Sequence, residues 1–325
     1  MAGQKPKVAF YWCASCGGCE EAAVDLAEAI LGVVEAVELV FWPVALDFKK
    51  KDIEALPDGS VAATFLNGAI RTTEHQEMAD LLRRKSQVLI SFGVCAASGG
   101  VPGLANLWDR RTIFETVYLR LPSNTNPSGT LPERSHRAGA HSVSLPGFYD
   151  TVRSVDQVVP VDYSIPGCPP TPALLADAVK ALLEGKLPPR GTVLAPDVAL
   201  CESCPRKDSK PERLAIRAFK RPHEIVADEA TCLLAQGLPC LGAATRGGCD
   251  SRCIRGNMPC TGCFGPTSRV RDHGAKALSA LASLIEATDE AGIAKALESV
   301  PDPVGTFYRY SLPASLLRRR PLGKI

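Results

Sequence analysis

The sequence predicts an α/β domain built on a parallel sheet, followed by an irregular, cysteine-rich region. In the first half of the 325-residue chain, short apolar runs alternate with segments of helical periodicity. In the second half this periodicity fades, and eight of the 13 cysteines fall between residues 201 and 263. A Pro- and Gly-rich stretch at 187–191 separates the two patterns. We therefore expect two domains, residues 1–190 and residues 191–325.

The expected strands are short apolar or β-branched runs, at residues 8–12, 37–42, 61–66, 87–92 and 155–161. The expected helices have apolar residues at helical spacing, at residues 19–31, 74–84, 171–184 and 275–287. Residues 121–148 are rich in Pro, Gly, Ser and Asn, which predicts a long irregular loop. This loop is either functional and partner-facing or a mobile surface insertion.

The composition excludes several classes of protein. The 37 Lys and Arg residues balance 35 Asp and Glu, so the net charge of +2 argues against a nucleic-acid-binding protein. No uncharged apolar stretch reaches the roughly 18 residues that a membrane span needs, and no secretory leader is recognisable. We therefore expect a cytoplasmic protein without a membrane span. The basic run at 316–320 is expected to be a solvated tail or a partner-docking segment.

An odd number of cysteines in a reducing compartment indicates metal or redox chemistry rather than a disulfide scaffold. Five cysteines follow three of the expected strands: Cys13, Cys16, Cys19, Cys95 and Cys168. Because the carboxyl ends of parallel strands share one edge, these loops should bring at least four thiols together. Four thiolates can hold a [4Fe–4S] cluster. The alternative is that these are inert, buried cysteines.

The second region offers two more sets of four. The pair Cys201 and Cys204 is completed most simply by Cys232 and Cys240. The remaining four are Cys249, Cys253, Cys260 and Cys263. A structural zinc ion would suit either of these two sets alone. It would have no obvious task at the first set, which is expected at the edge of the sheet. Three sets of four thiols favour an electron relay. No histidine is assigned as a ligand, and no nucleotide-binding motif is present.

Taken together, the motifs resemble the small, electron-transfer subunit of nickel–iron hydrogenases. The resemblance rests on four pieces: Trp12 with Cys16-Gly-Gly-Cys19-Glu20, Gly93-Val-Cys95, Pro166-Gly-Cys168-Pro-Pro, and the cysteines from 201 to 263. It implies a flavodoxin-like first domain whose proximal [4Fe–4S] cluster faces the nickel–iron centre of a separate large subunit. The implied ligands of that cluster are Cys16, Cys19, Cys95 and Cys168. Cys13 has no role in this assignment.

The resemblance also implies a distal cluster on Cys201, Cys204, Cys232 and Cys240, and a medial cluster on Cys249, Cys253, Cys260 and Cys263. The best-known, membrane-associated members have a histidine among the distal ligands and only three medial cysteines. Here both sets are complete, so we expect three [4Fe–4S] clusters.

Among subgroups, the chain is most similar to the cytoplasmic methyl-viologen-reducing (F420-non-reducing) hydrogenases, in which electrons leave through further iron–sulfur or flavin subunits. The implied function is electron transfer in a hydrogenase, with no catalytic residue on this chain. A related quinone-oxidoreductase subunit shares only the first domain. The alternatives are a zinc-stapled, non-redox interaction protein and a stand-alone ferredoxin-type carrier.

Overall fold

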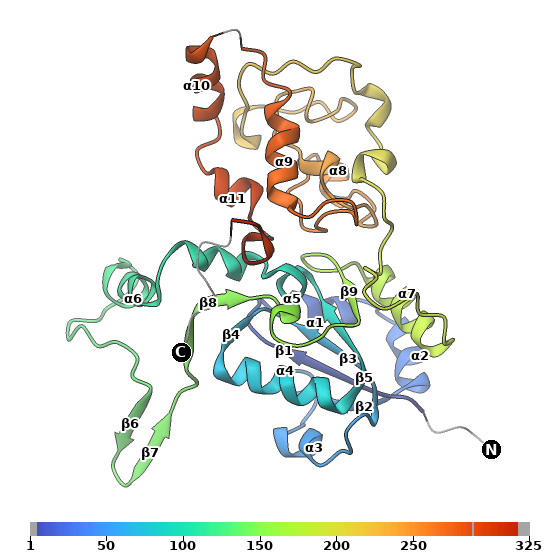
Figure 1. The fold of residues 1–325 in the computed structure, drawn as a ribbon, viewed down its shortest axis with the longest axis vertical. Helices are drawn as coiled ribbons and strands as arrows, with labels where there is room; N and C mark the ends of the chain where they lie inside the picture. The colour runs from blue at the N-terminus through green and yellow to red at the C-terminus, as the bar shows by residue number, and fades with distance from the viewer. Residues whose placement is uncertain (1–4, 288, 318–325) are drawn as a thin grey trace.

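The computed structural model describes residues 5–287 and 289–317, so residues 318–320 of the basic run lie outside the described part. Figure 1 shows two lobes. One lobe contains the sheet and its helices. The other is formed by the chain after about residue 195, coloured yellow to red in the figure, and carries most of the cysteines.

Five parallel strands form the sheet: β1 (Lys7–Trp12), β2 (Glu38–Phe41), β3 (Val61–Asn67), β5 (Ser86–Phe92) and β9 (Tyr163–Ile165). Their order is β2-β1-β3-β5-β9, the doubly wound order of the flavodoxin type. In register, Phe10 of β1 lies opposite Phe65 of β3, which in turn lies opposite Ile90 of β5. The winding reverses between β1 and β3, and ligand crevices form at such a point. The predicted α/β fold with a parallel sheet is confirmed.

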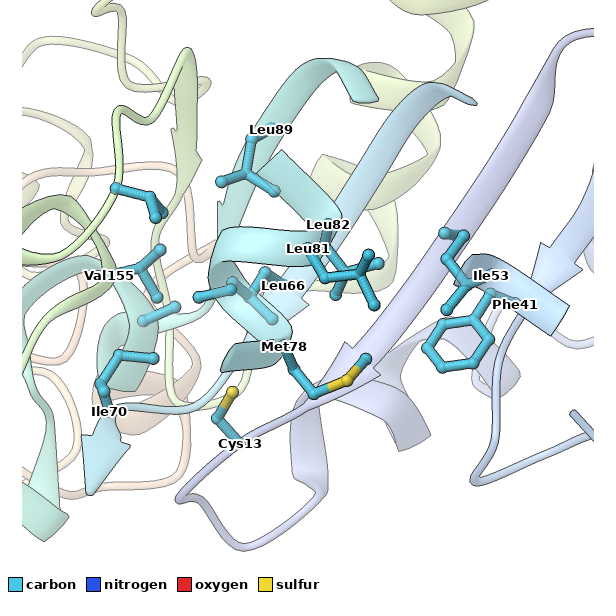
Figure 2. Close-up of a cluster of buried hydrophobic side chains, with 14 of the residues drawn as sticks. Cys13, Phe41, Ile53, Leu66, Ile70, Met78, Leu81, Leu82, Leu89 and Val155 are labelled. Carbon is cyan, nitrogen blue, oxygen red and sulfur yellow. The ribbon is translucent and has the colours of Figure 1, made fainter. Parts of the chain in front are cut away.

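Helices cover both faces of the sheet and enclose two apolar cores. On one face, α3 (Lys50–Glu54) and α4 (Thr73–Lys85) enclose a core that includes Leu66 and Met78 (Figure 2). On the other face, α1 (Gly18–Val24), α2 (Ala29–Ala36) and α7 (Pro172–Leu183) enclose a core around Phe65 and Phe92. A parallel sheet buried on both faces explains why its strands read as continuous apolar runs.

Two predicted elements differ in the structure. The helix expected at 19–31 is broken into α1 and α2, because Ala27 between them has a positive φ of 51°. The strand expected at 155–161 is wrong: a short 3-10 helix, η3 (Val155–Gln157), stands there, and the edge strand is β9. Val155 and Val159 are buried in the core beside α4 rather than paired in the sheet. Pro160, which has no N–H to donate to a strand ladder, follows them.

The segment expected to be an irregular loop contains regular structure. After α5 (Val94–Ser98) and η1 (Val101–Leu107), the chain forms α6 (Arg110–Glu115) and a π-helical turn, η2 (Thr116–Arg120). A hairpin of β6 (Ser135–Ala138) and β7 (His141–Ser144) follows, with every residue of both strands exposed. It projects away from both lobes (Figure 1). The chain returns through β8 (Phe148–Arg153), which pairs with β4 (Ile70–Thr72).

The cysteine-rich lobe begins with short helices: η4 (Leu200–Ser203), η5 (Lys207–Ser209), η6 (Pro222–Glu224), η7 (Leu241–Ala243) and α8 (Arg252–Arg255). Four more follow: α9 (His273–Ala282), α10 (Glu290–Glu298), α11 (Pro303–Phe307) and η8 (Leu312–Ala314). The helix expected at 275–287 is α9, shifted toward the N-terminus because the Asp272 side chain caps it by accepting from the amide of Ala275. Among the described residues, no helix has the length and apolar character of a membrane span.

Candidate metal centres

The first set of thiols lies at one edge of the sheet. Cys16 and Cys19 follow β1 at the start of α1, Cys95 lies in α5 directly after β5, and Cys168 follows β9. Cys19 and Cys95 are buried, whereas Cys16 and Cys168 are exposed. Burial raises the pKa of Cys19, and the three other thiols of the set raise it further. The structure therefore places at one edge of the sheet the four cysteines that the family resemblance implied as one set.

Two glycines allow the main chain to pass close to these thiols. Gly93, with φ of +86°, faces Cys19, and Gly100, with φ of +56°, faces Cys95. A Cβ atom at either position would overlap with the sulfur atom that it faces. Both positions therefore require glycine for two reasons, the left-handed backbone and the space around the thiol.

Cys13 lies in a different apolar core from Cys19 of this set. It is buried in the core beneath α4, together with Leu66, Ile70 and Met78 (Figure 2), and burial raises its pKa. Cys19 belongs to the core on the opposite face. The sequence contains a signal for the position of Cys13. Residues two apart in a strand share a face, so residue 13 continues the face of Ala9, and both lie in the same core.

A buried carboxylate beside the first set was not identified as a site residue from the sequence. Glu20 is 4% exposed and accepts hydrogen bonds from the Asn67 side-chain amide at 2.8 Å and from the Trp42 indole N–H. Asn67 in turn accepts a hydrogen bond from the Ser15 hydroxyl at 2.6 Å. Burial raises the pKa of Glu20, and its two hydrogen bonds oppose that shift. This network holds the loop that carries Cys16 against the end of β3. The sequence signal for this network was Asn67, a polar residue at the end of the apolar strand β3.

The second set lies in the cysteine-rich lobe. Its members line a cavity of about 30 Å³: Cys201, Cys204, Cys232 and Cys240. Burial raises the pKa of Cys201 to about 12, and the nearby Lys210 opposes that shift. Gly242 passes close to the set, because a Cβ there would lie 3.3 Å from the Cys201 sulfur. The buried Arg206 fixes the surrounding loops by donating to the carbonyl oxygens of residues 228, 231 and 254.

The third set lies between the other two. Its members line a cavity of about 140 Å³, together with Cys168 of the first set: Cys249, Cys253, Cys260 and Cys263. Burial raises the pKa of Cys263 to about 12, and a hydrogen bond from the Cys168 amide opposes that shift. On the other side, the Cys260 amide donates to the Cys240 sulfur at 3.3 Å. The three sets thus form a row, first to third to second: Cys168 of the first set lines the cavity of the third set, and an N–H···S hydrogen bond joins the third set to the second.

The donor sets fit iron–sulfur clusters. Each offers four cysteines, glycines leave room beside several sulfurs, and two of the sets enclose a cavity. Across residues 5–287 and 289–317, no group of three or more His, Cys, Asp or Glu side chains is placed so that it could hold a single metal ion.

Comparison with known proteins agrees with this architecture. The chain is 38% identical to the iron–sulfur subunit of the F420-non-reducing hydrogenase of Archaeoglobus profundus, over 97% of this chain and 98% of the relative. It is 37% identical to a subunit of the F420-non-reducing hydrogenase of Methanothermobacter thermautotrophicus, over 97% and 96% of the two chains. The chain belongs to this family of hydrogenase subunits. The relatives cover the cysteine-rich lobe as well as the sheet.

Two further likenesses concern the fold. The profile of a family described as NADH ubiquinone oxidoreductase, 20 Kd subunit, matches residues 16–182, which include the first set of cysteines but neither of the others. A chain of the [NiFeSe] hydrogenase from Desulfovibrio vulgaris Hildenborough superimposes with a TM-score of 0.53 at 18% identity, covering 82% of this chain and 95% of that one. This hydrogenase subunit therefore shares the fold of that chain. Its sheet lobe also matches the profile of the 20 Kd subunit family.

Proposed function

We propose that this chain is the electron-transfer subunit of a nickel–iron hydrogenase, an oxidoreductase that acts on H2. It would relay electrons between the H2-activating centre of a large subunit and an external acceptor. The observation that carries the proposal is the row of three four-thiol sets, in which one cavity joins the first set to the third and an N–H···S hydrogen bond joins the third to the second. Family membership supports it.

In this proposal the three sets hold [4Fe–4S] clusters: the first set is proximal, the third medial and the second distal. Such clusters supply one-electron redox chemistry. The chain's own residues supply thiolate ligands, exclude water, and donate the amide hydrogen bonds that help to set reduction potentials. Because burial raises the pKa of several of these thiols, cluster binding must displace their protons.

We further propose that the large subunit covers the exposed side of the proximal set. Cys16 is exposed there, and Trp12 beside it is 37% exposed. A further iron–sulfur or flavin subunit would accept electrons near the distal set. We expect the complex to be cytoplasmic, as in the subgroup that the sequence resembles.

The first test is anaerobic metal and acid-labile sulfide analysis with EPR of the reduced protein. Three four-iron clusters require about 12 iron and 12 sulfide per chain. About 11 iron, with a three-iron EPR signal after oxidation, would contradict the medial assignment alone. Zinc without sulfide would overturn the relay in favour of a zinc-stapled interaction protein. Iron and sulfide in a chain that never binds a large subunit would favour a ferredoxin-type carrier.

A matched pair of substitutions tests the proximal ligands. We expect Cys168→Ser to remove the proximal EPR signal and to abolish H2-dependent dye reduction by the complex with the large subunit. Cys13→Ser, which replaces a cysteine in the core beneath α4, should retain both. Retention of the signal in Cys168→Ser, or its loss in Cys13→Ser, would mean that the ligands are wrongly assigned.

A further inference from the structure

The end of the described chain crosses the junction between the first and third sets of thiols. We call residues 307–315 the C-terminal strap. The amide of Gly100, which lies against Cys95, donates to the carbonyl oxygen of Tyr310 at 3.2 Å. The side chain of Gln157 donates to the carbonyl oxygen of Pro313 at 2.9 Å. The ring of Pro313 occupies the space over Gly99 and Gly103, where a Cβ atom would overlap with it. The strap is thereby attached to the sheet lobe.

The same strap is attached to the cysteine-rich lobe. The Tyr310 hydroxyl forms a hydrogen bond of 3.3 Å with the hydroxyl of Thr261, which lies between two cysteines of the third set. The Tyr308 ring packs in the apolar core of that lobe with Ala277 and Leu281. Tyr310 is therefore held to the first set through its main chain and to the third set through its side chain.

The phenol ring of Tyr310 lies where the two sets meet. Burial raises its pKa, and the thiols of Cys263 and Cys168 raise it further, because both lie near the hydroxyl. These two cysteines, one from each set, line the same cavity. The ring is half-buried, between the Gly100 amide that its main chain accepts from and the Thr261 hydroxyl that its own hydroxyl meets.

We propose that Tyr310 is a positioning residue for electron transfer between the proximal and medial clusters; this inference rests on the proposed function. Its ring keeps water away from the junction of Cys168 and Cys263. Its hydroxyl holds the loop of Thr261 in place beside the proximal loops. Solvent exposure and hydrogen bonding near the sulfurs are among the factors that set cluster potentials, so both effects should be measurable without turnover.

The test is an EPR-monitored redox titration of the anaerobically purified, cluster-loaded chain and three variants. Tyr310→Ala removes the ring and the hydroxyl. Water at the junction stabilises the more negative, reduced clusters, so the proximal and medial potentials should shift upward while the distal potential stays constant. Tyr310→Phe keeps the ring, and we expect a smaller shift confined to the medial cluster. Tyr308→Phe, which removes a hydroxyl elsewhere in the strap, is the matched control and should shift none.

The outcomes separate the two proposals. Iron and sulfide content should equal that of the wild type in all variants, which excludes simple loss of a cluster. Unchanged potentials in Tyr310→Ala, or a distal shift as large as the medial one, would overturn the role of Tyr310 and leave the relay intact. A wild-type chain without iron and sulfide would overturn the proposed function, and the role of Tyr310 with it.

Discussion

The two lobes bury their apolar residues in different ways. In the sheet lobe, fully buried side chains such as Phe65, Leu66 and Ile90 form cores on both faces of the sheet. In the cysteine-rich lobe, the apolar clusters are smaller and include proposed cluster ligands, among them Cys240 and Cys260. Burial of apolar surface thus stabilises the first lobe on its own, whereas the second lobe has smaller apolar clusters and eight of the 13 cysteines.

The backbone of the second lobe also differs from that of the sheet lobe. From residue 200 to residue 255 its helices are only three or four residues long. Asp250, Ser251 and Asn257 have positive φ angles, a conformation that is unfavourable for residues with a side chain. A segment with little regular structure needs cross-links, and the proposed clusters would supply them.

The largest expected effect comes from removing iron. We expect anaerobic chelation to abolish amide protection between residues 197 and 265 while the strands of the sheet remain protected, because metal binding and folding are coupled in the second lobe only. Hydrogen exchange measured by mass spectrometry would show this. Reconstitution with iron and sulfide should restore protection. Simultaneous loss of protection in both lobes would mean that they do not differ in this way.

The second effect concerns matched leucines in the two lobes. Leu66→Ala empties a fully buried position of the sheet lobe and should cost about 2–5 kcal/mol of unfolding free energy in urea, through lost burial and a residual cavity. Leu238→Ala truncates an equally buried leucine that packs near Cys240 and Cys260. We expect its main effect to be faster loss of iron to a chelator. If Leu66→Ala accelerated iron loss as much as Leu238→Ala, the two lobes would not differ in how strongly their stability depends on the clusters.

The smallest effect is expected from Cys13→Ala. Cys13 behaves as a small apolar side chain in the core beneath α4, so its truncation should cost only about 1 kcal/mol. Iron content and EPR signals should be unchanged. The contrast is Cys19→Ala on the opposite face, which should remove about four iron atoms per chain. Loss of iron from the Cys13 variant would show that it, and not a member of the first set, is a ligand.

The sequence by itself determined most of the sheet, and it predicted the grouping of the cysteines. Continuous apolar runs mark β3 and β5, and the Cys-x-x-Cys spacings of Cys16 with Cys19 and of Cys201 with Cys204 are local. Parallel strands place the loops that follow them at one edge, so the convergence of the first set also followed from topology. These features depend on short-range periodicity, which a single sequence records directly.

Only the tertiary structure decided the features that depend on distant parts of the chain. Val155 enters a core instead of a strand because the space beneath the sheet is filled by residues from several helices. The network of Glu20 with Trp42 and Asn67 joins positions up to 47 residues apart. The order of the three thiol sets and the place of Tyr310 between two of them depend on how the lobes pack. No local pattern encodes such packing, since it is the sum of many weak contacts between segments far apart in the sequence.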